Sequence, residues 1–74
     1  MPAPLNRLKH RLGNGETVFG CWLGMADAYA AEMAATCGFD WLLIDGEHAP
    51  NGLRSTMAQL AVVEPSPSLP VVRL

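Results

Sequence analysis

The run from Trp41 to Ile44 constrains the fold most, because every one of its residues is apolar. A strand with one face in water alternates apolar and polar residues, whereas a strand that is apolar at successive positions is typical of a parallel sheet covered on both faces. The run passes directly into the polar sequence DGEH. We therefore predict a parallel strand over 40–45 that ends in charged groups.

The segments on both sides of this strand alternate between helical and strand-like patterns. We predict helices over 4–12, 28–37 and 52–63, and strands over 17–23, 40–45 and 70–74. Asp27 and Asn51 stand where N-caps are expected, and Gly38 stands where a helix should end. Strands that alternate with helices of about 10–15 residues indicate βαβ units, and therefore an α/β fold with a parallel sheet.

The apolar residues of the helices and loops indicate where the core should lie. The third helix carries one apolar stripe, which consists of Leu53, Met57, Leu60 and Ala61. We also expect core packing for Met25, Met33 and Met57. Cys21 and Cys37 are expected to be small buried thiols of a reducing compartment.

The number of strands limits how far residues 1–74 can complete a fold. Three parallel strands with their crossover helices on one face do not close a barrel, and they leave an apolar sheet edge unpaired. We therefore expect residues 1–74 to be a single partial domain, the N-terminal part of a longer α/β protein. Alone, they are expected to aggregate or to unfold with weak cooperativity.

Composition and charge argue against several function classes. The net charge of −2 provides no basic surface for nucleic acid, and the cations at Arg7, Lys9 and Arg11 are interpreted as the solvated face of a short helix. No apolar run approaches the ~20 residues that cross a membrane, and the N-terminus lacks the apolar core of a secretory signal. We therefore expect a cytoplasmic protein without nucleic-acid or membrane partners.

Residues that can carry chemistry lie at the end of each predicted strand. They are Trp22, Asp45, Glu47, His48 and Arg73. The carboxyl ends of parallel strands meet at one edge of a sheet, and α/β folds place their functional groups there. We therefore expect these side chains to converge on one site.

His48 is the first candidate for catalysis, because the ordinary pKa of an imidazole lets it accept or donate a proton near neutrality. Asp45 has two interpretations: it orients the imidazole, or it is simply the aspartate of an Asp-Gly turn. Glu47 either binds a metal or, as we favour, hydrogen-bonds to amides of the loop. The sequence DGEH is not a zinc motif, because it lacks a histidine pair one helical turn apart.

Arg73 and Trp22 also have two interpretations each. A guanidinium in the apolar sequence PVVRL must be paired, either with a ligand such as a 2-oxo acid or with Asp45 or Glu47 in an internal ion pair. Trp22 is either a core residue or a wall of the ligand site.

Four segments of the chain carry a resemblance to a known family. They are GCWLG at 20–24, AE at 31–32, GFDWLLIDGEHAPN at 38–51 and PVVR at 70–73. Together they closely resemble the HpcH/HpaI aldolase family, the metal-dependent pyruvate aldolases that include 4-hydroxy-2-oxoheptanedioate aldolase. The segments stand in the order and spacing of that family, and the resemblance covers nearly the whole chain.

The resemblance implies a (β/α)₈ barrel of ~250 residues, of which residues 1–74 form the N-terminal, unclosed part. It implies a lyase that reversibly cleaves a 4-hydroxy-2-oxo acid into pyruvate and an aldehyde, with Mg²⁺, Mn²⁺ or Co²⁺ as cofactor. It also implies His48 as the catalytic base and Arg73 as the group that stabilises negative charge on the keto oxygen. Trp22 would contact the substrate, and Asp45 would support His48.

The metal ligands of the resembled family, a Glu and an Asp, lie on later strands, so none is expected within residues 1–74. We therefore expect these residues alone to be inactive. The resemblance further implies a homo-oligomer, a hexamer in relatives, and a role in the catabolism of aromatic compounds. The alternative is a non-enzymatic remnant that associates with other chains through its open sheet edge.

Overall fold

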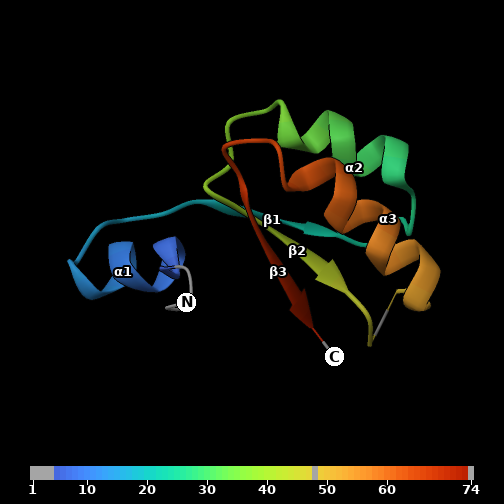
Figure 1. Ribbon diagram of the computed structural model, residues 1–74, viewed down its shortest axis with the longest axis horizontal. Helices are drawn as coiled ribbons and strands as arrows, with labels where there is room; N and C mark the ends of the chain where they lie inside the picture. The colour runs from blue at the N-terminus through green and yellow to red at the C-terminus, as the bar shows by residue number, and fades with distance from the viewer. Residues whose placement is uncertain (1–4, 48, 74) are drawn as a thin grey trace.

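The computed structural model describes residues 5–47 and 49–73, in which helices and strands alternate (Figure 1). In chain order they are α1 (Arg7–Gly13), β1 (Gly20–Leu23), α2 (Ala28–Ala35), β2 (Trp41–Asp45), α3 (Leu53–Val63) and β3 (Leu69–Arg73). The predicted order of elements and the α/β fold are both confirmed.

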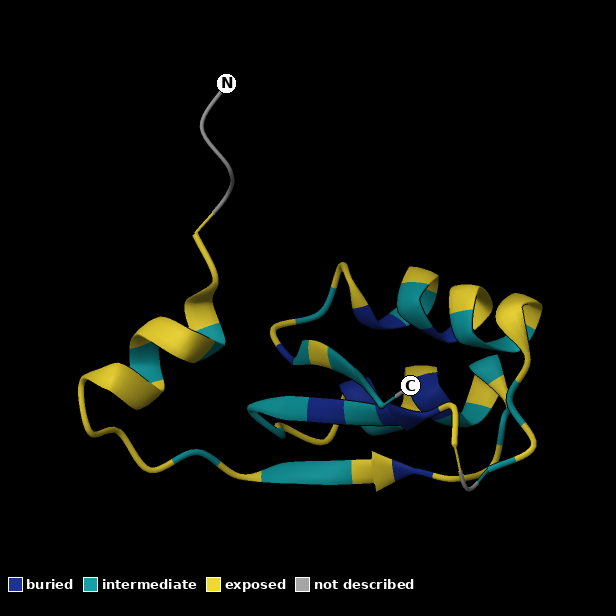
Figure 2. Cartoon of the chain, turned by 90° about the horizontal axis from the view of Figure 1, so that it is seen from below, coloured by how far each residue is buried: buried dark blue, intermediate teal, exposed yellow. Residues whose placement is uncertain are grey.

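The three strands form one parallel sheet in the order β1-β2-β3. Leu23 lies beside Ile44 in this sheet, and Asp45 lies beside Arg73. Helices α2 and α3 pack against each other over one face, whereas α1 lies apart on the side where the strands begin (Figures 1 and 2). The carboxyl ends of all three strands therefore meet at one edge, and the described residues do not close a barrel.

Alternate strand residues face the helices and form the core. Its members are Leu23, Ala31, Ala35, Leu42, Ile44 and Val63. Trp41 and Leu43 point to the opposite face of the sheet, as the alternation of a strand requires, and they are only half-buried. Within the described residues, helices therefore cover one face of β2, whereas the sequence predicted that both faces would be covered (Figure 2).

Strand β1 is shorter than the predicted strand over 17–23. It begins at Gly20, and the side chain of Phe19 is 70% exposed. The backbone N–H of Phe19 donates to Oδ2 of Asp40 at 2.8 Å, while the N–H of Asp40 donates to the carbonyl of Phe19 at 2.7 Å. Phe19 is thus held by one backbone bond and one side-chain bond to Asp40, outside the strand ladder.

Helix α2 begins and ends close to the predicted positions. Asp27 is the N-cap and accepts a hydrogen bond from the N–H of Tyr29 at 3.0 Å. The helix stops at Ala35, because the hydroxyl and the N–H of Thr36 both bond to the carbonyl of Met33 and tighten the last turn. Gly38 has a φ of 87°, the left-handed conformation expected after a helix.

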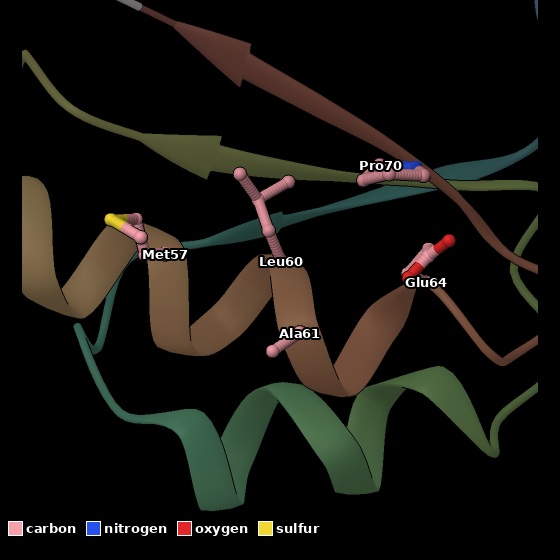
Figure 3. Close-up of a pocket in the computed structure, with 5 residues that line it drawn as sticks. All are labelled: Met57, Leu60, Ala61, Glu64 and Pro70. Atoms are coloured by element: carbon pink, nitrogen blue, oxygen red, sulfur yellow. The ribbon is translucent and has the colours of Figure 1, made fainter.

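The predicted apolar stripe of α3 is buried only in part, because Leu60 packs against the core while the other three residues are exposed. Leu53 and Met57 are 78% and 60% exposed, and the buried residues of this helix are Gln59 and Val63. Gln59 takes a buried position because its side-chain amide is hydrogen-bonded, as buried polar groups must be. Part of the predicted stripe instead lines a shallow groove of about 360 Å³ (Figure 3), together with Glu64 and Pro70.

The expected burial of the sulfur-containing residues is also mostly wrong. Met25 and Met33 are 70% and 65% exposed, and Cys37 lies on the surface, while Cys21 is half-buried. The prediction relied on their apolar character alone. Helix α2 packs against α3 and contributes its alanines Ala31 and Ala35 to the core, while its larger side chains, Tyr29 and Met33, are exposed.

The amino edge of the sheet is joined to α1 by ion pairs. Arg11 donates from Nε to Glu16 at 3.1 Å and approaches Oδ1 of Asp40 to 3.0 Å through Nη2. The N–H of Phe19, and next the guanidinium of Arg11, hold the pKa of Asp40 below its usual value, and the two carboxylates raise the pKa of Arg11. Most of the basic cluster of α1 remains exposed, as predicted. None of the helices in the described chain is long and apolar enough to span a membrane.

Candidate functional site at the carboxyl edge of the sheet

Four of the five predicted site residues come together at the carboxyl edge of the sheet. Trp22 lies near the end of β1, Asp45 ends β2, Glu47 follows it, and Arg73 ends β3. Hydrogen bonds and an ion pair join them from three separate segments of the chain. His48 lies outside the described residues, so its predicted role stays a prediction.

Asp45 is the buried centre of this group, with 4% of its surface exposed. Its Oδ1 accepts from the backbone N–H of Glu47 at 2.9 Å, as the aspartate of a turn does, while its role toward His48 stays a prediction. Its Oδ2 accepts from Nε1 of Trp22 at 3.0 Å, a contact that the sequence did not predict. The carboxylate therefore fixes the loop after β2 and the indole of β1 in one position.

Glu47 and Arg73 form an ion pair at the rim of the site. Nε of Arg73 donates to Oε2 of Glu47 at 2.9 Å, with 38% and 46% of the two side chains exposed. The internal ion pair, one of the two interpretations of Arg73, is thus formed with Glu47, and the binding of a ligand by Arg73 stays a prediction. Asp45 accepts from the amide of Glu47, and the favoured role of Glu47 itself in binding loop amides stays a prediction.

Trp22 is 51% exposed, so its interpretation as a core residue is wrong. The guanidinium carbon of Arg73 lies 5.8 Å from the centre of the indole ring, within the range of a cation–π contact. The indole face and the guanidinium thus form one surface that reaches solvent.

Gly46 connects the loop to the third strand. Its N–H donates to the carbonyl of Arg73 at 2.8 Å. A Cβ at this position would lie 2.7 Å from the same carbonyl oxygen, which is too close without a shift of the backbone. Glycine is therefore required here for the close approach of two backbones.

A polar network below this loop was missed from the sequence. The side chain of Asn51 donates to the carbonyl of Asp45 at 2.7 Å, and its Oδ1 accepts from Gln59 at 2.6 Å. The prediction that Asn51 is the N-cap of α3 is therefore wrong. The N-cap is Gly52, whose N–H donates to Oγ of Ser55 at 2.9 Å. A serine three residues after the cap was the signal that could have placed the helix start at Leu53.

The described residues do not fit a metal centre. Within 5–47 and 49–73, no three side chains from His, Cys, Asp and Glu are grouped so that they could hold a metal ion. The carboxylates of Asp45 and Glu47 are engaged by Trp22, a backbone amide and Arg73. The expected metal ligands, which would lie outside residues 1–74, therefore stay a prediction.

Comparison with models of protein families finds one family that matches the part of the chain with the three strands. The model of the family described as HpcH/HpaI aldolase/citrate lyase matches residues 18–74, which include all three strands and the site.

Relatives of this chain include enzymes and a solved structure. It is 61% identical over 74 residues to the hydroxypyruvate/pyruvate aldolase of Roseovarius nubinhibens, covering 100% of the chain and 29% of that relative. It is 57% identical over 63 residues to the 4-hydroxy-2-oxovalerate aldolase of Rhodococcus jostii, covering 85% of the chain and 24% of that relative. A crystal structure of an HpcH/HpaI aldolase/citrate lyase family protein from Burkholderia cenocepacia superposes with a TM-score of 0.89 and 45% identity, over 95% of this chain and 28% of that one. The chain thus spans less than a third of the length of these relatives.

Proposed function

Since the chain belongs to the HpcH/HpaI aldolase/citrate lyase family, we propose that residues 1–74 form the opening part of a (β/α)₈ barrel aldolase. The observation that carries this proposal is the convergence of Trp22, Asp45, Glu47 and Arg73 at the carboxyl edge of the sheet. This edge is where barrels of parallel strands hold their active sites. The proposed reaction is the reversible cleavage of a 4-hydroxy-2-oxo acid into a 2-oxo acid and an aldehyde.

Arg73 is proposed to bind and stabilise the 2-oxo acid. Its Nε is bonded to Glu47, and 38% of its side chain is exposed to solvent. A planar guanidinium held by an ion pair and an indole is suited to bind adjacent carboxylate and keto oxygens. When the C3–C4 bond breaks, negative charge develops on the keto oxygen, and a preorganised cation beside it lowers the barrier.

His48 is proposed as the base that removes the proton of the 4-hydroxyl group. Removal of this proton lets the C4–O bond become a carbonyl while the C3–C4 electron pair moves into the enolate. The proposal depends on the position of His48 in the sequence, directly after the buried Asp45 and the rim residue Glu47. In the reverse direction, the same residue would return the proton to the new hydroxyl group.

A divalent metal is proposed as the cofactor of the complete enzyme, with its protein ligands outside residues 1–74. Such an ion acts as a Lewis acid toward keto and carboxylate oxygens. The proposed substrate class is supported by the names of the relatives, which are a hydroxypyruvate/pyruvate aldolase and a 4-hydroxy-2-oxovalerate aldolase. A 2-oxo acid is common to all of these, and it is the part that Arg73 would bind.

A chimera tests the proposed function directly. In it, residues 1–74 replace the matched 29% of the Roseovarius nubinhibens aldolase, to which they are 61% identical. The chimera and the parent aldolase are assayed side by side for pyruvate release from 4-hydroxy-2-oxo acids, among them 4-hydroxy-2-oxovalerate, in the presence of Mg²⁺, Mn²⁺ or Co²⁺. The chimera should cleave the substrates that the parent cleaves, and His48→Ala should abolish this release. A chimera that folds and assembles like the parent aldolase but releases no pyruvate would contradict the proposal.

The alternative function is association of a remnant with other chains through the open sheet edges. β1 and β3 each pair with only one strand among the described residues. Residues 1–74 expressed alone should be inactive under either hypothesis. A defined complex with a stoichiometric partner would favour the remnant, whereas aggregation would agree with a partial barrel.

A further inference from the structure

The loop after β2 is held from below by the polar network of α3. The side chain of Asn51 spans from the end of the loop to its start and donates to the carbonyl of Asp45 at 2.7 Å. This bond closes the loop at its base, because the two residues stand on either side of it. The closure of the loop at its base therefore depends on the orientation of the Asn51 amide.

Two contacts fix the orientation of that amide. Oδ1 of Asn51 accepts from Nε2 of Gln59 at 2.6 Å and from the hydroxyl of Ser55 at 2.9 Å. With both donors at Oδ1, the NH₂ group of Asn51 must point to the carbonyl of Asp45. Gln59 is 1% exposed, and its second N–H is bonded to the backbone carbonyl of Ser55 at 3.0 Å. Gln59 is thus fixed by its own helix.

The contacts continue from the base of the loop to the rim of the site. Asp45 binds the amide of Glu47 and the indole of Trp22, and Glu47 binds Arg73. A rotation of the Asn51 amide would break its bond to the carbonyl of Asp45. Asp45 would then be less firmly held, and so would the amide and indole that it binds.

We propose that Gln59 is a positioning residue of the site, which acts through Asn51 on the loop between β2 and α3. The proposal rests on the proposed function for its effect on catalysis, and on the network alone for its effect on the loop. A fully buried glutamine needs a reason, because an apolar residue of similar size would avoid the cost of burying an amide. Orientation of Asn51 supplies that reason.

The main test is Gln59→Met in the chimera, which keeps the length of the side chain and removes its donors. We expect kcat to fall about tenfold, at the low end of the effects seen when a group that orients a site residue is removed. The matched control is Val63→Ala, one turn later on the same buried face of α3. It should lower the melting temperature while leaving kcat within about twofold of the parent chimera, because only stability changes.

A double-mutant cycle shows whether Gln59 acts through Asn51. If it does, Asn51→Ala combined with Gln59→Met should lower kcat no further than Asn51→Ala alone, because the link is already broken. Losses of kcat that multiply would show independent roles and would overturn the proposal.

The conservative variant Gln59→Glu adds a second readout, the pH dependence of kcat, which a role in packing alone would not change. An ionised Glu accepts but does not donate, whereas a protonated Glu can donate to Oδ1 of Asn51. Burial favours the protonated form, so the kcat of this variant relative to the parent should rise about threefold from alkaline to mildly acidic pH. The ratio for Gln59→Met should stay constant with pH. A flat ratio for both variants would count against the proposal.

Hydrogen–deuterium exchange separates this proposal from the proposed function. The amides of Gly46 and Glu47 are bonded to Arg73 and Asp45, and they should exchange faster in Gln59→Met than in Val63→Ala. An inactive parent chimera would refute the proposed function, while faster exchange would still support the positioning of the loop. Unchanged exchange, or an active chimera whose kcat does not respond to Gln59→Met, would overturn the inference.

Discussion

The amino ends and the carboxyl ends of the strands form two edges of the sheet, and each of them holds an arginine beside carboxylates. The two arginines make different contacts. At the amino edge, Arg11 binds Glu16 and Asp40 through two of its nitrogens, and Asp40 also binds the backbone of Phe19. At the carboxyl edge, Arg73 binds Glu47 through Nε, and its guanidinium lies against an exposed indole.

The difference shows how position in the sheet decides the role of a residue type. The contacts of Arg11 and Asp40 join α1 to the starts of the strands, so this edge contributes to stability. The contacts of Arg73 hold its guanidinium at a surface that is open to solvent, so this edge is suited to bind a ligand. Barrels of parallel strands show the same division between their two ends.

Exchange of each arginine for lysine tests this division with the largest expected effect. In the chimera, Arg73→Lys keeps the charge but loses the planar fork, so kcat/KM for 4-hydroxy-2-oxovalerate should fall about 100-fold. Arg11→Lys should leave kcat/KM within about twofold, because the ion pairs of Arg11 lie at the amino edge, away from the site. Equal losses in the two variants would contradict the comparison.

Two glycines separate stability from activity at the same two edges. Gly46→Ala would push against the carbonyl of Arg73, and Gly20→Ala would overlap the indole ring of Trp41. Each should lower the free energy of unfolding by about 1–3 kcal/mol, the usual cost of overpacking. Only Gly46→Ala should also lower kcat, by about tenfold, because it displaces the loop of the site.

The control for both glycines is Gly24→Ala, since a Cβ at Gly24 meets no atom within 4 Å. This variant should match the parent chimera in melting temperature and kcat. A loss of kcat in Gly20→Ala as large as that in Gly46→Ala would show that the two edges do not differ in function.

The order of elements and the position of the site could be predicted from the sequence for a physical reason. The apolar run of β2 and the alternation of strands and helices determine a parallel sheet, and a parallel sheet brings strand ends together. A charge in an apolar strand requires a partner, so the sequence offered an ion pair of Arg73 with Asp45 or Glu47 beside a bound ligand, and the structure shows the pair with Glu47.

The buried face of α3 could not be predicted in the same way. The stripe Leu53, Met57 and Leu60 is more apolar than the face that carries Gln59, and apolar character was the only guide to burial. The burial of Gln59 depends on Asn51, eight positions earlier in the chain, whose side chain meets it only after the loop has folded. The contact of Trp22 with Asp45 was missed for a similar reason, since it joins residues on different strands.

Trp22→Phe sharpens the comparison at the level of a single hydrogen bond. The phenyl ring keeps an aromatic face for Arg73 but removes the donor to the buried carboxylate of Asp45. We expect kcat to fall about fivefold, the effect of losing roughly 1 kcal/mol of positioning. Trp41→Phe, toward the amino edge, should lower the melting temperature without changing kcat. An unchanged kcat in Trp22→Phe would show that the indole N–H has no role in the site.

Asp40→Asn gives the smallest effect and tests the structural edge through pH. The pKa of Asp40 is held below 3.8 by the N–H of Phe19 and by Arg11, so its contribution to stability is complete above that pH and is lost as the pH falls through the lowered pKa. At neutral pH, the variant should melt a few degrees lower than the parent chimera with unchanged kcat. The difference should begin to close below about pH 3.8, where the unfolded chain takes up a proton, and should vanish once the pH falls below the lowered pKa of the folded parent, because the parent has then lost the same charge. A difference that persists in acid would mean that Asp40 acts through its shape, and the amino edge would then owe its stability to packing and not to charge.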